Sequence, residues 1–182
     1  MEAAEMISGI LHPVPVSVVS SVLATAMVWR AGVTRWVVVA LGMILVPLTV
    51  MYLWRGKEFF RARENRKTIY LIGILLAVSY TSASHLFSAP SPVPMISVSV
   101  PVAGAVFAGL NLRMKISVHT GVMSGAATIL TGLEPIAGLS FLLVPLVGWS
   151  RIKLDRHEPL QVLAGAVITP AVFLGIHLLG SS

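Results

Sequence analysis

The chain has 182 residues, of which 56% are hydrophobic and only 11% are charged, whereas a soluble globular domain carries roughly 25% charged residues. This composition excludes an ordinary soluble domain and predicts a single integral membrane domain over residues 1–182. The absence of cysteine excludes disulfides and cysteine-based metal sites. In a membrane protein, a formal net charge of +6 indicates surface loops or a phosphate site rather than nucleic-acid binding.

The first apolar segments occupy the N-terminal third of the chain. Residues 6–29 contain no Asp, Glu, Lys or Arg, and Pro13 and Pro15 interrupt the run, so we expect the first span to begin near these prolines. The acidic residues before this run argue against a cleavable signal peptide. Residues 30–35 are predicted to form a tight loop, and residues 36–54, with a tryptophan at each end, a second span.

The rest of the chain alternates between polar clusters and apolar runs. A basic run at 55–67 precedes an uncharged stretch at 68–112, which is long enough for two spans around a proline-rich turn at 88–94. Residues 116–133 are rich in small residues, which predicts an interior helix. The last two predicted spans are residues 136–149 and 160–179. Close packing contacts are expected at Gly121, Gly125, Gly138 and Gly165.

These segments predict an all-α, polytopic transmembrane helix bundle with seven spans, or six if the proline-interrupted first segment lies in the interface. Three polar clusters, at 55–67, 115–119 and 150–157, are separated by two spans each. They are therefore expected on the same side of the membrane, where they would form one site at the membrane surface. The excess of Lys and Arg in these loops favours the cytoplasmic side, although phosphate-binding cations would leave the orientation open.

The three clusters contain the groups that phosphoryl transfer requires. That reaction needs cations around the phosphate oxygens, a nucleophile in line and an acid for the leaving group. Arginine forks suit phosphate oxygens, and histidine serves as nucleophile or general acid because its pKa lies near neutrality. The candidate site residues are the cations Arg151, Arg66, Arg63 and Lys115, the hydroxyl of Ser117, and the histidines His157 and His119.

Two of the clusters resemble motifs of a known family. Ser150-Arg151-x5-His157-x3-Gln161 is similar to the third motif, Ser-Arg-x5-His-x3-Asp, of the type-2 phosphatidic acid phosphatase (lipid phosphate phosphatase) superfamily. Residues 115–119, with Ser117 and His119 two positions apart, resemble its second motif, Pro-Ser-Gly-His. The basic run at 55–67 lies where the first motif, Lys-x6-Arg-Pro, is expected. The resemblance covers about residues 55–166.

The resemblance implies a role for each matching residue. His157 corresponds to the nucleophile that forms a phosphohistidine, and His119 to the general acid that protonates the leaving group. Arg151 and Ser117 correspond to phosphate ligands, and Arg66 is taken as the first-motif arginine. The family uses no metal and no cofactor. The implied substrate is a lipid phosphomonoester or diphosphate, such as phosphatidate, phosphatidylglycerol phosphate or a polyprenyl diphosphate.

Three departures from the family pattern bear on activity. Gln161 replaces the aspartate that orients the nucleophilic histidine; it can accept a hydrogen bond from His157 at helical i,i+4 spacing but carries no charge. Val118 replaces the glycine of the second motif. The first-motif spacing fails, because Phe59 precedes Arg66 by seven positions where a lysine is expected. Arg63 or Lys115 would then supply the missing cation.

Two other functions stay open. The first is a non-catalytic lipid-phosphate binder or carrier that uses the same basic residues, and the second is a phosphotransferase that passes the phosphoryl group to a lipid alcohol. Single cations beside membrane segments are otherwise expected to act as headgroup anchors. His85, among several hydroxyl residues, is expected to take part in interhelical hydrogen bonding, and His12 and His177 to lie at the interface.

Overall fold

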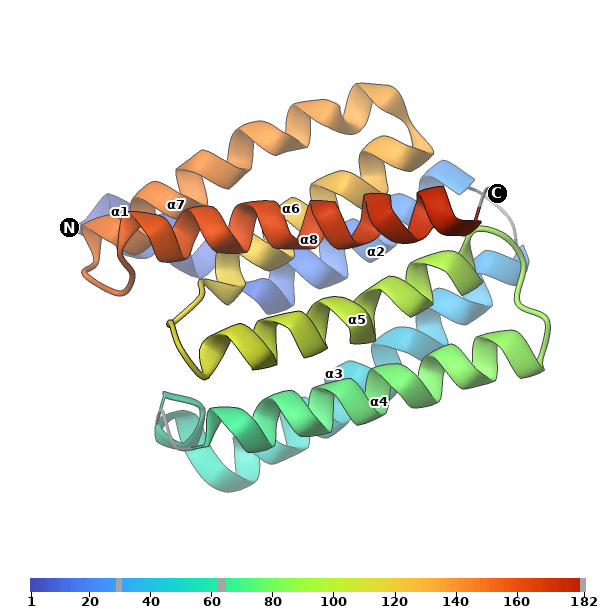
Figure 1. Ribbon diagram of the computed structural model, residues 1–182, viewed down its shortest axis with the longest axis horizontal. Helices are drawn as coiled ribbons and strands as arrows, with labels where there is room; N and C mark the ends of the chain where they lie inside the picture. Colours follow the sequence, from blue (N-terminus) through green and yellow to red (C-terminus); the bar gives the residue numbers. More distant parts are fainter. Residues whose placement is uncertain (29–30, 62–64, 181–182) are drawn as a thin grey trace. The chain divides into compact units, whose positions relative to one another are not determined.

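The structure is a computed structural model that describes residues 1–28, 31–61 and 65–180. These residues are helical throughout, with short connections and no strand among them (Figure 1). The elements are α1 (Glu2–Ile10), α2 (Pro13–Val28), α3 (Ala31–Arg61), α4 (Arg66–Leu86), α5 (Val93–Asn111), α6 (Val118–Leu133), the 3₁₀ helix η1 (Pro135–Leu142), α7 (Leu143–Lys153) and α8 (Pro159–Gly180). The all-α class predicted from the sequence is confirmed.

Four segments within the described residues are long and apolar enough to cross a membrane. They are Lys67–Leu86, Val93–Asn111, Pro135–Lys153 and Pro159–Leu179. The pair α1 and α2, bent by 46° at the break between them, would make a fifth. Large apolar side chains such as Leu163, Val167 and Leu174 are exposed on the outside of α8, as expected of a surface in contact with lipid. The helices thus support a membrane protein with four or five spans.

The chain divides into two compact units, and each is described by itself. The first contains Met1–Val28 and Gly109–Ser182, and the second contains Trp29–Ala108. In the first unit α6 is the central helix, packed by α2, α7, α8 and η1, while α1 lies along α7 (Figure 1). The small residues of α6 explain this position. Eight residues of the helix are buried, and all but Met123 and Leu130 are small: Thr120, Gly121, Met123, Ser124, Gly125, Ala126, Ala127 and Leu130.

Glycines allow the close approach of helices in the first unit. A methyl group at Gly165 would lie 2.5 Å from Thr120 Oγ1 and would also meet the Ser117 carbonyl, so α8 lies directly on the first turn of α6. A methyl at Gly125 would lie 2.6 Å from Thr169 Cγ2. Of the four predicted packing contacts, those at Gly125 and Gly165 are confirmed as close approaches, and a methyl at Gly138 would make ordinary contact with Thr131. The Thr120 hydroxyl adds a hydrogen bond across this interface, to the Val162 carbonyl at 3.1 Å.

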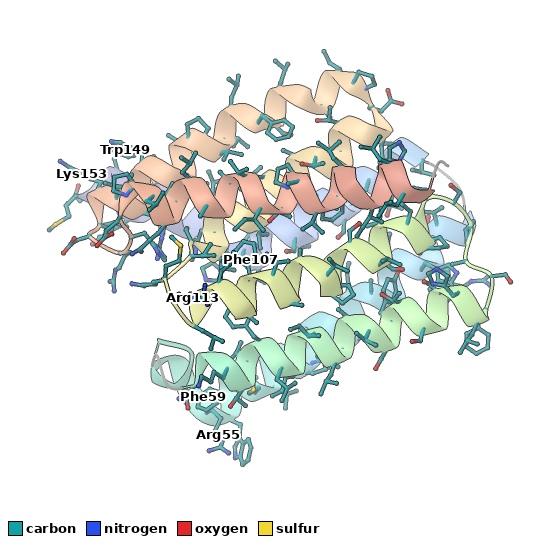
Figure 2. The ribbon with its side chains drawn as sticks, in the orientation of Figure 1. Arg55, Phe59, Phe107, Arg113, Trp149 and Lys153 are labelled. Atoms are coloured by element: carbon teal, nitrogen blue, oxygen red, sulfur yellow. The ribbon has the colours of Figure 1, made fainter. Side chains whose placement is uncertain are left out.

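The second unit consists of α3, α4 and α5. The Tyr80 hydroxyl donates to the Trp36 carbonyl at 3.0 Å and ties α4 to α3. The helical path of α3 is interrupted at Gly56, whose φ of 73° suits glycine. The guanidinium of Arg55 lies 4.3 Å from the Trp54 ring and 5.6 Å from that of Phe59 (Figure 2), an arrangement typical of a membrane-interface anchor.

Several boundaries differ from the sequence-based prediction, because α3 continues to Arg61 and α7 to Lys153, beyond the span ends expected at 54 and 149. Residues 30–35 were expected to form a loop, but α3 already begins at Ala31 and includes Arg35. No proline or β-turn pattern stops the helix there, and a long arginine side chain can leave a helix end toward water without breaking it. A helix does begin at the prolines, because α2 starts at Pro13, where a proline fits the first helical turn, but the candidate span also includes α1 before it.

Candidate functional site

Two of the three predicted clusters meet at one end of the first unit, where α6 begins, α7 ends and α8 begins. Lys115 Nζ donates to the Arg156 carbonyl at 2.6 Å, and His157 Nδ1 lies 3.3 Å from the Lys115 carbonyl. The main-chain N–H of Ser117 donates to the Gln161 carbonyl at 3.1 Å. Residues about 40 positions apart in sequence are therefore held together by direct hydrogen bonds.

The turn between α7 and α8 brings His157 back toward Arg151. Asp155 adopts a left-handed conformation with φ of 52°, which aspartate tolerates better than most residues and which ends helices commonly. The main-chain N–H groups of Arg156 and His157 then donate to the Arg151 carbonyl, at 3.0 and 3.3 Å. This local fold sets the position of the histidine relative to the last turn of α7.

Hydrogen bonds select one tautomer of His157. Its Nδ1 lies 3.1 Å from Gln161 Oε1 and 3.3 Å from the Lys115 carbonyl oxygen, and both partners are acceptors. The same Gln161 oxygen also accepts from the Glu158 N–H at 3.4 Å, which supports its assignment as oxygen. Nδ1 therefore carries the proton and Nε2 keeps its lone pair. The hydrogen bond between His157 and Gln161 predicted from their spacing is present.

The charge state of His157 follows from its surroundings. Burial lowers the pKa of His157 below its ordinary value, and the nearby Lys115 and Arg151 lower it further. The hydrogen bonds to Gln161 and to the Lys115 carbonyl raise the pKa, but by less than burial and the two cations lower it. His157 is consequently neutral at pH 7, the state in which Nε2 can attack an electrophile.

His119 and Arg151 each carry a buried nitrogen without a hydrogen-bond partner. The atoms are His119 Nε2 and Arg151 Nε, and no other side-chain atom in the described part of the chain is buried and unpaired in this way. Leaving a buried polar nitrogen unpaired costs about 1–3 kcal/mol, and more for a charged group. Both atoms belong to residues predicted to act in the site, and an exogenous acceptor placed there would relieve the cost.

The charged groups around these two residues are basic. Arg151, His12 and His157 all lie close enough to His119 to act on it electrostatically, and Arg156 acts in the same way on Arg151. Like charges held together at a partly buried site favour the binding of an anion. Within the described residues, no three histidine or acidic side chains are grouped as a metal ion would require.

Ser117 begins α6 as its N-cap residue. Its hydroxyl oxygen accepts from the Thr120 N–H at 3.5 Å, and the side chain is fully buried. The capping contact accounts for the start of the helix here. It also fixes His119 in the first turn of α6, beside the turn that carries His157.

The first predicted cluster cannot be compared with the other two. Arg66 is the first residue of α4 in the second unit, but its side chain lies outside the described residues. Arg63 lies outside the described residues altogether. The site is therefore built from the first unit alone, with Arg151, His157, Gln161, Lys115, Ser117 and His119.

Two residues near the N-terminus, Ser8 and His12, adjoin the site, although no sequence pattern indicated them. Arg151 Nη1 donates to the Ser8 hydroxyl at 2.6 Å. The ring of His12, expected only at the interface, packs edge-on against His119 with ring centres 5.1 Å apart and an interplanar angle of 89°. Ser8 and Arg151 are separated by 143 positions, so no local spacing could have indicated the contact.

Trp149 and Lys153 mark the outside of the same end of α7, where their side chains project away from the first unit (Figure 2). Both are exposed. A tryptophan followed by a lysine one turn later is typical of the boundary between a bilayer and water. This supports a position of the site close to a membrane surface.

Comparison of the chain with family models, curated proteins and solved structures found no match.

Proposed function

We propose that this protein is a membrane lipid phosphatase, which hydrolyses a phosphomonoester or diphosphate of a lipid through a phosphohistidine intermediate. The observation that carries the proposal is the pair of unpaired buried nitrogens, His119 Nε2 and Arg151 Nε, in a cluster of basic groups. A tetrahedral oxyanion with several acceptor oxygens suits such a cluster. The motif resemblance supports phosphate as that anion.

The membrane setting supports a lipid as the carrier of the phosphate. The site lies where apolar helices end, so that a headgroup could bind among the polar residues while its chains stay beside the exposed apolar faces of the helices. A fully water-soluble substrate would not need this arrangement. Phosphatidate, phosphatidylglycerol phosphate and polyprenyl diphosphates present similar phosphate oxygens, so each of these lipids is a candidate substrate.

The proposed first step is in-line attack by His157. Its Nε2 lone pair, available because Nδ1 donates to Gln161 and the Lys115 carbonyl, forms a bond to phosphorus while the bond to the leaving oxygen breaks. The negative charge of the bound phosphate favours the imidazolium form of His119. His119 then gives its proton to that oxygen, and the lipid alcohol or phosphate departs. Arg151 and Lys115 stabilise the charge on the remaining phosphate oxygens.

Hydrolysis of the intermediate completes the cycle. A water molecule attacks phosphorus, and neutral His119 accepts a proton from it. The nitrogen–phosphorus bond breaks, which returns the lone pair to His157 Nε2 and releases inorganic phosphate. His119 regains in this step the proton that it gave in the first, so the two steps balance.

Gln161 favours a second function, a binder or carrier of lipid phosphate without catalysis. Its neutral amide orients His157 at 3.1 Å but stabilises a positively charged imidazole less than a carboxylate would. A carrier would bind the lipid phosphate and release no inorganic phosphate. A phosphotransferase would instead release the lipid alcohol and pass the phosphoryl group to an added alcohol acceptor.

The full topology is also part of the proposal. We propose seven membrane segments, in which α3 and the interior helix α6 cross the bilayer in addition to the bent pair α1–α2 and the four long apolar segments. The chain contains no cysteine, so single cysteines introduced into each connection can be labelled without background. A thiol reagent that cannot cross the membrane is expected to label the cysteines of every second connection and to leave the others unlabelled. A pattern that places Lys115 and His157 on opposite sides would refute the common site.

The deciding experiment measures inorganic phosphate release by the purified protein from lipid monophosphates and polyprenyl diphosphates, with a metal chelator present. We expect release by the wild type and a loss of at least about 10³-fold in His157→Ala and His119→Ala. His177→Ala, at the far end of α8, serves as the matched control and should retain activity. Binding without release in the wild type would favour the carrier.

A further inference from the structure

Helix α1 has one buried face, which lies on the helix that carries Arg151. It packs along α7 at the end where the site lies (Figure 1), and its buried residues are Ala4 and Ser8. The chain then bends by 46° into α2, with His12 at the break. These residues precede the segment that resembles the phosphatase motifs, so the resemblance assigns nothing to them.

Ser8 fixes the orientation of the Arg151 guanidinium. The contact uses Nη1, at 2.6 Å from a hydroxyl that is itself buried. Because the guanidinium is planar, a hydrogen bond at one end sets the direction of all its N–H groups. The edge that carries Nε–H is left for another acceptor, and this is an edge that binds oxyanions through two parallel hydrogen bonds.

His12 restricts the ring of His119 in a similar way. The two rings meet edge to face at 5.1 Å, the arrangement that aromatic pairs prefer. His12 is itself held, since the Val14 N–H lies 3.4 Å from its Nδ1. His119 Nε2 has no partner of its own, so packing rather than hydrogen bonding at this atom determines where it points.

We infer that α1 and its junction with α2 complete the site, with Ser8 as the positioning residue for Arg151 and His12 as the positioning residue for His119. Each of the two groups with an unpaired nitrogen is thus held by a contact from the same N-terminal segment. The inference rests on the proposed function for its kinetic consequences, whereas its consequences for phosphate binding can be measured without turnover.

The kinetic test separates the two residues. Ser8→Ala should raise KM for a short-chain phosphatidate about tenfold, the effect of one lost hydrogen bond to a charged group, and Ser8→Thr, which keeps the hydroxyl, should restore it. His12→Ala should lower kcat about tenfold because the acid is no longer aligned. His12→Phe keeps an edge-to-face ring and should restore kcat.

The controls address folding and simple packing. A methyl group at Gly9 would meet no atom within 4 Å, so Gly9→Ala changes the same helix beside Ser8 and should behave as the wild type. Size-exclusion profiles and thermal unfolding identify any variant that does not fold. Unchanged KM in folded Ser8→Ala, or unchanged kcat in folded His12→Ala, overturns the inference for that residue. Failure of His12→Phe to restore kcat overturns positioning by the ring.

A binding measurement keeps this inference separate from the proposed function. In a His157→Ala background, which cannot turn over, addition of Ser8→Ala should weaken binding of the same phosphatidate about tenfold, while addition of Gly9→Ala should not. If the wild type releases no phosphate but Ser8→Ala weakens binding, the phosphatase proposal fails and the Ser8 inference holds. Unchanged binding refutes the Ser8 inference, and absence of binding by the wild type refutes both.

Discussion

The polar residues of α4 and α5 and those of the candidate site are both partly buried, but they differ in how they are satisfied. In the second unit, Ser84 Oγ donates to the Thr81 carbonyl at 2.8 Å and lies 2.9 Å from Ser97 Oγ. The Thr81 hydroxyl donates to the Ser97 carbonyl at 2.7 Å, and His85 Nδ1 lies 2.9 Å from the Thr81 carbonyl. These four residues form a network that binds two helices together.

The candidate site has the opposite property, because two buried nitrogens there have no partner. A polar network in which every group has a hydrogen-bond partner stabilises a helix bundle. Unpaired buried groups raise the free energy of the folded protein, and a ligand that pairs with them lowers it again. The comparison separates two histidines that the sequence alone presents alike. His85 joins the hydrogen-bonded network between α4 and α5 through contacts within α4, to Thr81 and Ser84, rather than through the interhelical hydrogen bond expected from the sequence, while His119 Nε2 is left unpaired in the site.

After the loss of either site histidine, the largest effect is expected at Arg151, which carries one of the two unpaired nitrogens. Arg151→Lys keeps the positive charge but removes the planar fork and its Nε–H donor. We expect phosphate release to fall about 10²-fold or more, as on loss of one donor that stabilises a developing oxyanion. Steady-state kinetics of the purified variant measure this. Lys153→Arg, an exposed position on the same turn of α7, is the matched control, and equal losses in both would break the comparison.

The next prediction concerns the packing on which the site depends. Gly165→Ala places a methyl group against Thr120 and the Ser117 carbonyl, so the free energy of unfolding should fall by about 1–3 kcal/mol. Thermal or denaturant unfolding in detergent measures it. Gly175→Ala lies on the same helix where a methyl meets nothing within 4 Å and should not destabilise. An unchanged free energy of unfolding in Gly165→Ala would show that α8 does not lie directly on the first turn of α6.

Substitutions of Gln161 should change the pH dependence of turnover. The reaction requires neutral His157, so turnover should fall as the pH drops through the lowered pKa of this residue. A carboxylate at position 161 favours the imidazolium and raises the pKa of His157, so Gln161→Asp should move the acidic limb of the pH–rate profile to higher pH. Gln161→Leu removes the acceptor and should move it to lower pH, with about tenfold lower turnover. Coincident profiles would exclude His157 as the titrating group.

The smallest effect is expected in the hydrogen-bonded network between α4 and α5. Ser97→Ala removes one hydroxyl from the network of α4 and α5, and the free energy of unfolding should decrease by about 1 kcal/mol. KM and kcat for the lipid substrate should be unchanged. A kinetic change comparable with that of Ser8→Ala would mean that this network also takes part in substrate binding, and the distinction drawn here would be lost.

The sequence predicted those parts of the site that depend on short spacing and on helix direction. Arg151 and His157 lie six positions apart, and the even number of segments between Lys115 and His157 predicted a common end, where the hydrogen bonds are found. Ser8 and His12 could not be predicted, because their contacts depend on the bend after α1 and on tertiary packing. The count of six to seven spans exceeded the four or five that length and composition support, since α3 and α6 do not stand out by these measures.

The two oxygens of Gln161 accept hydrogen bonds from different residues. Its main-chain carbonyl accepts from the Ser117 N–H, and its side-chain oxygen accepts from His157. A helix rises 1.5 Å and turns about 100° for each residue, so inserting or deleting one residue between Pro159, where α8 begins, and Gln161 would turn Gln161 away from one partner or the other. The spacing from His157 to Gln161 is therefore more restricted than the side chains at 158–160. A search for distant relatives should thus keep Arg151, His157 and the spacing from His157 to Gln161 and let the other residue types of this loop change.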